Sequence, residues 1–347
     1  MRPEPAIPRA RQREFSVVVC TRNRVRYLER ALDSLLAQEY PNDRYELIVV
    51  DNGSGDGTRS LVERYADRGP VPVIYLPEPR PGTSFARNAG AERARHELVA
   101  YLDDDTVAAP GWLAAFDVAV RQYGAVAGGG PVEPVLEEGV VSPTWWADPS
   151  IQAIFGLDHA HLCPDEPVTR IRWPLWLGGG NCFYAKRILL EHGGFRTDIG
   201  PVGGRYRVAE DIELNARLER SGVPIHYVRE ASIQHTITAD RLNPRYIWMR
   251  SWAAGTTSAG AAAVLGNRSR AAGPVQLARA GLRLLLERGG GRTAAGSRLA
   301  YQLGFLRQRA ACALQSVSRP TVPEARRSAS ELRGASPDAE SEHAERK

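Results

Sequence analysis

Long apolar stretches are missing from this sequence. No run approaches the roughly 20 consecutive apolar residues that a membrane-spanning helix needs. The nearest candidate, residues 246–265, is interrupted by Arg250 and by several Ser, Thr and Gly residues. Residues 1–14 carry Pro and Arg without the apolar centre of a signal peptide. We therefore expect a soluble, cytoplasmic protein that begins with a flexible lead over residues 1–14.

Cysteine pairs and the common nucleotide-binding motifs are also absent. The four cysteines, Cys20, Cys163, Cys182 and Cys312, are far apart and form no CxxC pair, which excludes a zinc ribbon or a disulfide framework. No GxGxxG follows the first apolar run and GxxxxGK[ST] does not occur, so neither a dinucleotide-binding fold nor a P-loop is supported. Any nucleotide would have to be held by acidic and polar loops.

Composition indicates an enzyme that handles anionic ligands. The 347 residues are 43% hydrophobic and 24% charged, which is ordinary for a soluble enzyme with a sizeable core. The net charge of +5 comes mainly from arginines scattered along the whole chain. This distribution suits a pyrophosphate or a membrane surface and argues against a dedicated nucleic-acid surface.

Short apolar runs alternate with helical patterns over the first hundred residues. Three amphipathic helices separate the four runs, which have the length and composition of buried strands: 15–20, 45–50, 72–77 and 98–102. This alternation predicts a parallel, doubly wound sheet, in which ligands bind at the carboxyl ends of the strands. Beyond Gly111 the pattern is looser, and residues 126–135 suggest one further strand in a mixed part of the sheet.

Polar residues follow three of these strands. The fourth strand ends in Asp103, Asp104 and Asp105, the second in Asp51, and the first in the loop 21–24. Adjacent carboxylates repel each other, and a hard cation such as Mg²⁺ or Mn²⁺ relieves that repulsion. An isolated aspartate triplet is as well explained by a solvated acidic turn. Its position on the same sheet edge as the other polar loops favours a metal site.

A second acidic pair, Glu210 with Asp211, opens a predicted helix, where the helix dipole favours carboxylates. Simple first-turn charge is the alternative explanation. Three glycines, Gly178 to Gly180, allow backbone to lie against a ligand or form a tight turn. His235 follows a later strand, and a lone histidine is more often structural than a ligand.

Four parts of the sequence, in this order, resemble the inverting family-2 glycosyltransferases with the GT-A fold, over roughly residues 15–238. They are VVVCTRNR (17–24), LIVVDNGSGDGT (47–58), GTSFARNAG with AYLDDDT (82–90 and 100–106), and GGGNCFYAKR leading to AEDIELNARL (178–187 and 209–218). The resemblance implies an α/β fold of GT-A type, with a doubly wound, mixed, mainly parallel sheet.

The resemblance also implies how a nucleotide-sugar donor would be held. Thr21 and Arg22 occupy positions that line the nucleobase pocket in the family, and Asp51 the position that binds the base. Arg22 replaces the usual aromatic residue of this loop, so a guanidinium would stack on the base instead. Arg87 falls where the family keeps a basic residue near the donor.

The metal and the catalytic base follow from the same resemblance. Asp103 to Asp105 match the DxD motif, in which the first aspartate faces ribose or metal and the last binds Mn²⁺ or Mg²⁺. Asp104 belongs with the donor-binding residues or faces away. His235 completes the metal shell in some relatives. Asp211 matches the general base, and Glu210 would orient acceptor or donor.

Residues 239–315 resemble a helical extension found in one subgroup of these enzymes. Helices are expected at 274–288 and 298–315, each with an apolar face that either packs on the transferase domain or rests on a membrane surface. Residues 316–347 have the composition of a disordered tail.

Arg241, Arg245 and Arg250 lie near the expected active-site edge at the start of this extension. Their charges would either be solvated on a helix surface or contact a phosphate or the acceptor.

The sequence therefore predicts a metal-dependent inverting glycosyltransferase that moves a sugar from a nucleoside-diphosphate sugar to an acceptor hydroxyl. The acceptor would be a glycan, a lipid-linked glycan or a secondary metabolite, reached in the cytoplasm or at the inner face of the membrane. A sugar-nucleotide pyrophosphorylase is one alternative, although the glycine-rich, lysine-containing loop expected after its first strand is missing. A non-catalytic carbohydrate-binding relative is the other.

Overall fold

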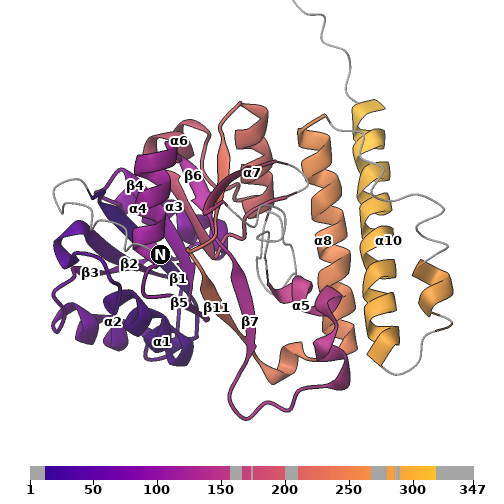
Figure 1. Ribbon diagram of the computed structural model, residues 1–347, viewed down its shortest axis with the longest axis horizontal. Coiled ribbons are helices and arrows are strands. Elements are labelled where there is room, and N and C mark those ends of the chain that lie inside the picture. The colour runs from indigo at the N-terminus through magenta and orange to yellow at the C-terminus, as the bar shows by residue number, and fades with distance from the viewer. Residues whose placement is uncertain are drawn as a thin grey trace, which may run out of the picture.

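The computed structural model describes residues 12–156, 166–172, 175–199, 210–266, 280–284, 286 and 290–317. The strands form two sheets. Two long C-terminal helices, α8 (Pro244–Val264) and α10 (Gly290–Val317), stand next to each other along one side of the molecule (Figure 1).

The larger sheet has eight strands in the order β3-β2-β1-β4-β9-β6-β10-β8. These strands are β1 (Phe15–Thr21), β2 (Tyr45–Asp51), β3 (Val73–Pro77), β4 (Leu98–Asp103), β6 (Ala127–Gly129), β8 (Val168–Ile171), β9 (Asn181–Ala185) and β10 (Ile225–Val228). Strands β1 to β4 pair in parallel, which confirms the four strands expected from the apolar runs. Strand β9 runs antiparallel to both β4 and β6, so the sheet is mixed, as expected.

Helices cover both faces of this sheet. They are α1 (Val25–Leu36), α2 (Thr58–Ala66), α3 (Thr83–Arg93), α4 (Trp112–Tyr123), α6 (Lys186–Glu191) and α7 (Glu210–Arg220). Helix α5 (Pro149–Phe155) packs instead beside β7 and α8, and short 3-10 turns lie at Asn42–Arg44, Thr144–Ala147 and Ala239–Arg241. On β1, Val17 packs in a cluster with Leu32 of α1, whereas its neighbour Val18 packs on the other face with Ala86 of α3 and Leu214 of α7. Side chains alternate between the faces of a strand, so β1 contributes to both cores.

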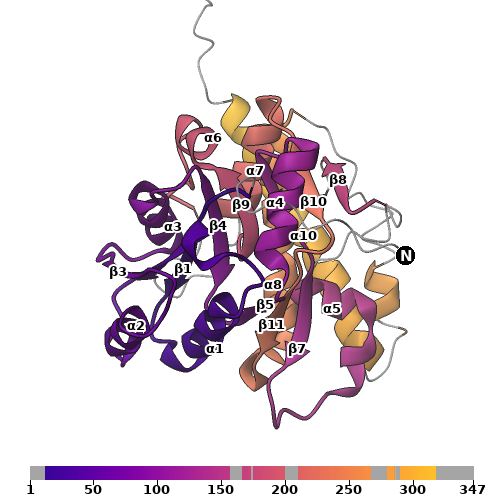
Figure 2. The same ribbon diagram turned by 60° about the vertical axis from the view of Figure 1, so that its left-hand side comes forward.

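A second sheet was not predicted. It has three short strands in the order β5-β11-β7, namely β5 (Thr106–Ala108), β11 (Ile233–Ile237) and β7 (Val132–Leu136) (Figure 2). The single strand expected at 126–135 is therefore wrong, because this stretch contributes β6 to one sheet and β7 to the other. Gly130 lies between them, where a β-carbon would collide with the Ala231 carbonyl oxygen, and only glycine permits that approach.

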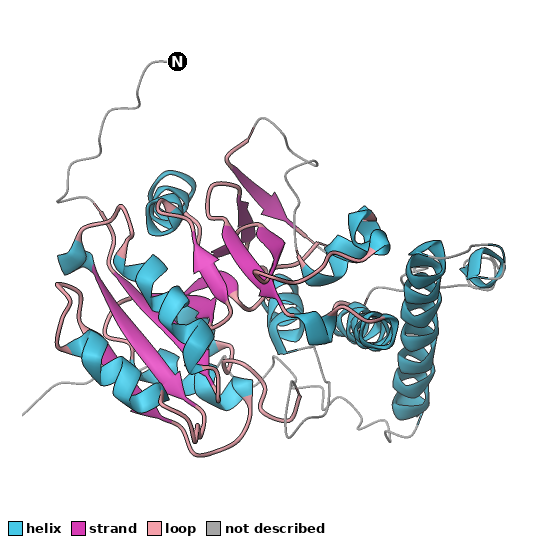
Figure 3. Cartoon of the chain, turned by 90° about the horizontal axis from the view of Figure 1, so that it is seen from below, coloured by secondary structure: helices cyan, strands magenta, loops and turns pink. Residues whose placement is uncertain are grey.

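The C-terminal helices pack closely on each other and on α7. Gly255 of α8 and Gly304 of α10 bring the two backbones together, since a β-carbon on either would collide with the opposite backbone. Ala261 of α8 also packs against Ile212 and Ala216 of α7. Figure 3 shows this part of the molecule as helices alone, beside the part that contains the strands.

The expected extension is helical where it is described. Helix α10 begins earlier and ends slightly later than the predicted helix at 298–315. Residues 280–284 are helical, while most of the predicted helix at 274–288 lies outside the described residues, as do residues 1–11 of the lead and 318–347 of the tail. Neither α8 nor any other helix in the described ranges combines the length and apolar character of a bilayer-crossing segment.

Candidate active site

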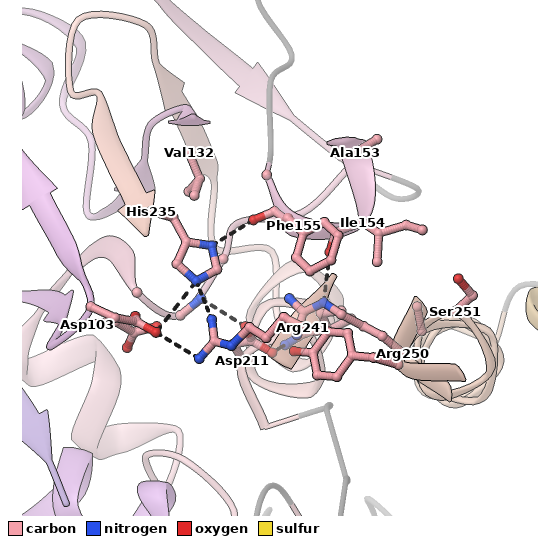
Figure 4. A pocket seen from close by; sticks show the side chains of 18 of the residues that line it. Asp103, Val132, Ala153, Ile154, Phe155, Asp211, His235, Arg241, Arg250 and Ser251 are labelled. Atoms are coloured by element: carbon pink, nitrogen blue, oxygen red, sulfur yellow. Dashed lines mark hydrogen bonds and ion pairs between the residues drawn. The ribbon is translucent and has the colours of Figure 1, made fainter. Parts of the chain in front are cut away.

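One cavity of about 1420 Å³ collects the carboxyl ends of β1 and β4, the first turn of α7 and the middle of β11. Nine of the predicted site residues line it: Thr21, Arg22, Arg87, Asp103, Asp104, Asp105, Glu210, Asp211 and His235. In Figure 4, Asp103, Asp211, His235 and Arg241 approach the cavity from different elements. The carboxyl edge of the sheet, which the strand ends predicted as the ligand-binding edge, therefore lines a cavity.

The three aspartates have separate environments. Asp104 and Asp105 are buried and share the guanidinium of Arg24, whose Nη1 lies 3.0 Å from Asp104 Oδ1 and 2.8 Å from Asp105 Oδ2. The Thr21 hydroxyl donates to Asp104 Oδ2 at 2.7 Å. The Asp103 side chain is 43% exposed and faces Arg87. Asp104 therefore does not face away but organises the loop after β1.

Burial and neighbouring charge move these carboxyl groups in opposite directions. Burial raises the pKa of Asp104 to about 6, against the lowering effect of Arg24. Burial alone would also raise the pKa of Asp105, but its contacts with His235, Arg24 and Arg241 outweigh burial and hold that pKa below its ordinary value. Asp105 is consequently the carboxylate most firmly kept in its charged form, as a metal ligand must be.

Arg87 contacts carboxylates on two elements, Asp103 at the end of β4 and Glu210 at the start of α7. Its Nη2 lies 3.1 Å from Asp103 Oδ1 and its Nη1 lies 3.0 Å from Glu210 Oε1, and the side chain is almost fully buried. The guanidinium also lies over the ring of Phe195, 5.4 Å from its centroid. Burial alone would lower the pKa of Arg87, but the carboxylates of Asp103, Glu210 and Asp211 raise it well above its ordinary value. Arg87 and Glu210 thus form a buried pair within the chain.

The glycine loop positions the predicted base. The Gly179 N–H donates to Asp211 Oδ2 at 2.8 Å, and the Ile212 N–H donates to Asp211 Oδ1 at 2.8 Å. A β-carbon at Gly179 would lie 2.6 Å from Arg87 Nη1, and one at Gly180 would collide with the Asp103 carboxylate. Gly179 and Gly180 therefore let backbone approach Arg87 and Asp103 closely, and all three glycines line the cavity.

Gly180→Ala is expected to destabilise the protein by about 1–3 kcal/mol, because the added methyl group must displace Asp103 or the loop. Gly178→Ala is the matched control, since a β-carbon at Gly178 meets no atom within 4 Å. Chemical denaturation of both variants measures the difference. Equal stability of the two alanine variants would show that the loop does not press on Asp103.

His235 lies between the aspartates and the C-terminal extension. Its Nδ1 is 2.9 Å from the Phe155 carbonyl oxygen, which fixes Nδ1 as the protonated nitrogen and leaves Nε2 as an acceptor. Arg241 Nη1 is 3.0 Å from that Nε2, and Arg241 Nη2 is 2.9 Å from Asp105 Oδ2. The guanidinium of Arg241 thus spans Asp105 and His235.

Two of the three predicted metal ligands fit one ion. Asp105 Oδ2 and His235 Nε2 are 3.7 Å apart, and ligands about 2 Å from an ion can be separated by that distance. The described residues contain no group of three or more His, Cys, Asp and Glu side chains that could hold a metal. The pair therefore suits an ion that takes its other ligands from phosphates and water, as Mg²⁺ does. Asp103 contacts Arg87, as Asp105 contacts Arg24 and Arg241, and it stays a predicted third ligand.

Two of the three arginines expected near the active-site edge, Arg241 and Arg250, are not solvated helix charges. Solvated helix charge is wrong for Arg241, which pairs with Asp105, although it holds for the exposed Arg245. Arg250 lines the cavity, and its Nε donates to the Ile154 carbonyl oxygen at 2.8 Å. Arg24 was not singled out at all. The buried carboxylates were the available signal, because buried charges are usually paired.

Asp51 does not line the cavity. Its carboxylate accepts hydrogen bonds from the Ser54 N–H and the Tyr75 hydroxyl, both at 2.8 Å. The neighbouring Asn52 does line it and accepts from the Gly82 N–H at 2.8 Å, which anchors the loop before α3. Arg22 lines the cavity and is exposed. Arg22 and Asn52 therefore line this part of the cavity, and Asp51 lies behind them, bonded to Tyr75.

Comparison with known sequences gives matches to sugar transferases. Residues 16–148 match the sequence model of the family described as Glycosyl transferase family 2. A glucosyl-dolichyl phosphate glucuronosyltransferase of Haloferax volcanii is 28% identical over 243 residues, which are 69% of this chain and 74% of the relative. A validoxylamine A glucosyltransferase of Streptomyces hygroscopicus is 28% identical over 62% of this chain, which spans about half (54%) of that relative.

Solved structures share the fold. A mannosyltransferase from Pyrobaculum calidifontis, in complex with GDP-Man and Mn²⁺, aligns with a TM-score of 0.51 and 19% identity over 93% of this chain and 80% of that one. A structure of residues 1–349 of TarS from Staphylococcus aureus aligns with a TM-score of 0.50 and 17% identity over 86% of this chain and 92% of that one. These similarities identify the fold as GT-A.

Proposed function

We propose that the chain is a family-2 glycosyltransferase and that it transfers a sugar from a nucleoside-diphosphate sugar to an acceptor hydroxyl by a single, inverting displacement; the family match over residues 16–148 and the related sugar transferases support this. The observation that supports this reaction best is the meeting of two acidic groups in one cavity: Asp105 with His235, and Asp211 on the glycine loop. Family membership favours transfer over the pyrophosphorylase alternative.

We assign Asp211 as the general base that takes the proton of the acceptor hydroxyl. Its two oxygens are held by the backbone N–H groups of Gly179 and Ile212, so the carboxylate has a fixed direction towards the cavity. The acceptor oxygen forms a bond to the anomeric carbon while the bond from that carbon to the diphosphate oxygen breaks. The departing diphosphate keeps the electron pair, and the acceptor proton passes to Asp211.

Asp105 and His235 would hold a divalent cation, Mn²⁺ or Mg²⁺, together with the donor diphosphate. When bound, such an ion neutralises charge that develops on the leaving diphosphate. The chain supplies further positive charge at this end of the cavity, because Arg24 and Arg241 both contact Asp105. Arg24 and Arg241 would therefore lie beside the donor diphosphate, with Arg24 also held by Asp104.

A panel of nucleotide sugars tests the proposal. We expect one donor to raise the thermal unfolding temperature only when Mn²⁺ or Mg²⁺ is present, and transfer from an α-linked donor to give a β-linked product. Thermal shift and NMR of the anomeric proton measure the two results. Retention of the anomeric configuration, or release of pyrophosphate from a nucleoside triphosphate and a sugar phosphate, would overturn it.

Metal binding itself gives a separate prediction. Asp105→Asn is expected to weaken Mn²⁺ binding by at least about tenfold, whereas Arg241→Met is expected to strengthen it because a competing cation leaves Asp105 and His235. Asp240→Asn, which removes an exposed carboxylate outside the cavity, should change nothing. Electron paramagnetic resonance of free Mn²⁺ follows binding without any need for turnover. Unchanged affinity in Asp105→Asn would remove Asp105 from the metal site.

A further inference from the structure

The cavity continues well beyond the predicted catalytic groups. Its outer part is lined by residues of α5, α8 and α10 and by the helical residues 280–284. Figure 4 shows Arg250 and Ser251 separated from Asp103 and His235 by Phe155 and Ile154. This outer part therefore lies next to the part of the cavity that contains Asp105 and His235, and is separate from it.

Charge divides the cavity into two halves. Every acidic residue among its lining residues is at the catalytic end: Asp103, Asp104, Asp105, Glu210 and Asp211. The outer part contributes three arginines, Arg250, Arg283 and Arg298, and no carboxylate among the residues that the structure describes. A wall with this charge selects an anionic ligand.

Neutral groups hold Arg250 and Arg298 in place without cancelling their charge. Arg250 Nε donates to the Ile154 carbonyl oxygen at 2.8 Å, and Arg298 Nη1 donates to the Ser150 hydroxyl at 3.2 Å. The Nε of Arg298 is buried and has no hydrogen-bond partner. Within the described ranges no ion pair reaches Arg250, Arg283 or Arg298, whereas Arg24, Arg87 and Arg241 at the catalytic end each contact a carboxylate.

The C-terminal helices that form this part of the cavity also carry exposed apolar side chains. Five of the nine large hydrophobic side chains that are exposed in the described residues lie after residue 243: Trp248, Met249, Leu282, Leu286 and Leu303. Leu282 lines the cavity and is next to Arg283. Ile154 and Tyr301 add further apolar surface to the wall. A ligand in the outer part would therefore meet guanidiniums and apolar surface together.

We propose that the outer part of the cavity binds a phosphate carried by the acceptor, with Arg250 and Arg298 as its ligands and Arg283 at the entrance. This inference rests on the proposed transferase function, because it assigns this end of the cavity to the acceptor. Guanidiniums match phosphate oxygens with paired, charge-assisted hydrogen bonds. The apolar part of such an acceptor would leave the cavity past Leu282.

Equilibrium binding to the full chain, without donor or metal, tests the proposal. Farnesyl phosphate is expected to bind at least about tenfold more tightly than farnesol, and Arg250→Met or Arg298→Met should each remove about tenfold or more of that affinity. Arg283→Met tests an exposed position where folding is not at risk. Arg245→Met is the matched control, since Arg245 is exposed on α8 and does not line the cavity.

The probes also identify where the phosphate comes from. Tighter binding of farnesyl phosphate than of glucose 1-phosphate supports a lipid-linked acceptor, and equal binding supports a water-soluble one. Equal affinity for farnesol and farnesyl phosphate, or an equal loss in Arg245→Met, would overturn the proposal. Asp211→Asn separates the proposed transferase function from the proposed phosphate site, because it should stop sugar transfer while phosphate binding in the outer cavity is retained.

Discussion

Asp211→Asn is expected to slow sugar transfer by about a thousandfold, within the range that a positioned general base contributes. The asparagine keeps the shape of the side chain but cannot take the acceptor proton. It can accept only one of the two backbone hydrogen bonds from Gly179 and Ile212, so a small loss of stability should accompany the loss of activity. Initial rates at saturating donor and acceptor measure the effect.

The control for Asp211→Asn is a change that removes a nearby carboxylate outside the cavity. Asp240→Asn meets that requirement and should leave the rate within about twofold of the unmodified protein. Donor affinity is measured by nucleotide titration in both variants and should persist. A fall of less than tenfold in the Asp211→Asn rate would mean that another group accepts the proton.

Arg87→Met should cause the largest loss of stability, about 3–5 kcal/mol. The substitution leaves the carboxylates of Asp103 and Glu210 without the guanidinium that both contact, and breaking a buried pair from one side is strongly destabilising. Because Arg87 joins Asp103 at the end of β4 to Glu210 at the start of α7, donor binding should weaken as well. Urea unfolding gives the free energy, and nucleotide titration gives the donor affinity.

Two comparisons distinguish the loss of a buried pair from a general loss of packing. Arg93→Met changes an exposed arginine on the same helix and should cost less than about 0.5 kcal/mol. Adding Glu210→Gln to Arg87→Met should restore part of the stability, because it removes one uncompensated charge. If the double variant is no more stable than Arg87→Met, the charge on Glu210 does not cause the loss.

The first half of the fold could be predicted because its signals are local. Strands β1, β2 and β4 are continuous apolar runs, and the helices between them show the spacing of one buried face, so periodicity was sufficient. The second sheet could not be predicted in this way. Strand β5 has three residues and pairs with β11, which begins at Ile233, so its existence depends on a contact between distant parts of the chain.

The candidate site shows the same division between local and distant information. The strand-end rule brought Asp103 to Asp105 to one edge because all the residues involved end strands of one sheet. The side chains that pair with those aspartates could not be predicted from the sequence. Whether Arg241 is solvated or pairs with Asp105 depends on where a turn after β11 comes to rest, and nothing in the neighbouring sequence specifies that.

The glycine contact between α8 and α10 bears on how this enzyme can evolve. Gly255 and Gly304 bring backbone against backbone, so the spacing of the two helices does not depend on long side chains that can change shape. Residues that line the cavity lie close to these glycines in sequence, including Ala254 and Tyr301. Substitutions at Ala254 or Tyr301 can therefore reshape the outer cavity while the helix spacing, and with it the position of Asp211 on the adjoining α7, is kept. If the outer cavity takes the acceptor, as proposed, new acceptors become accessible without a new catalytic centre.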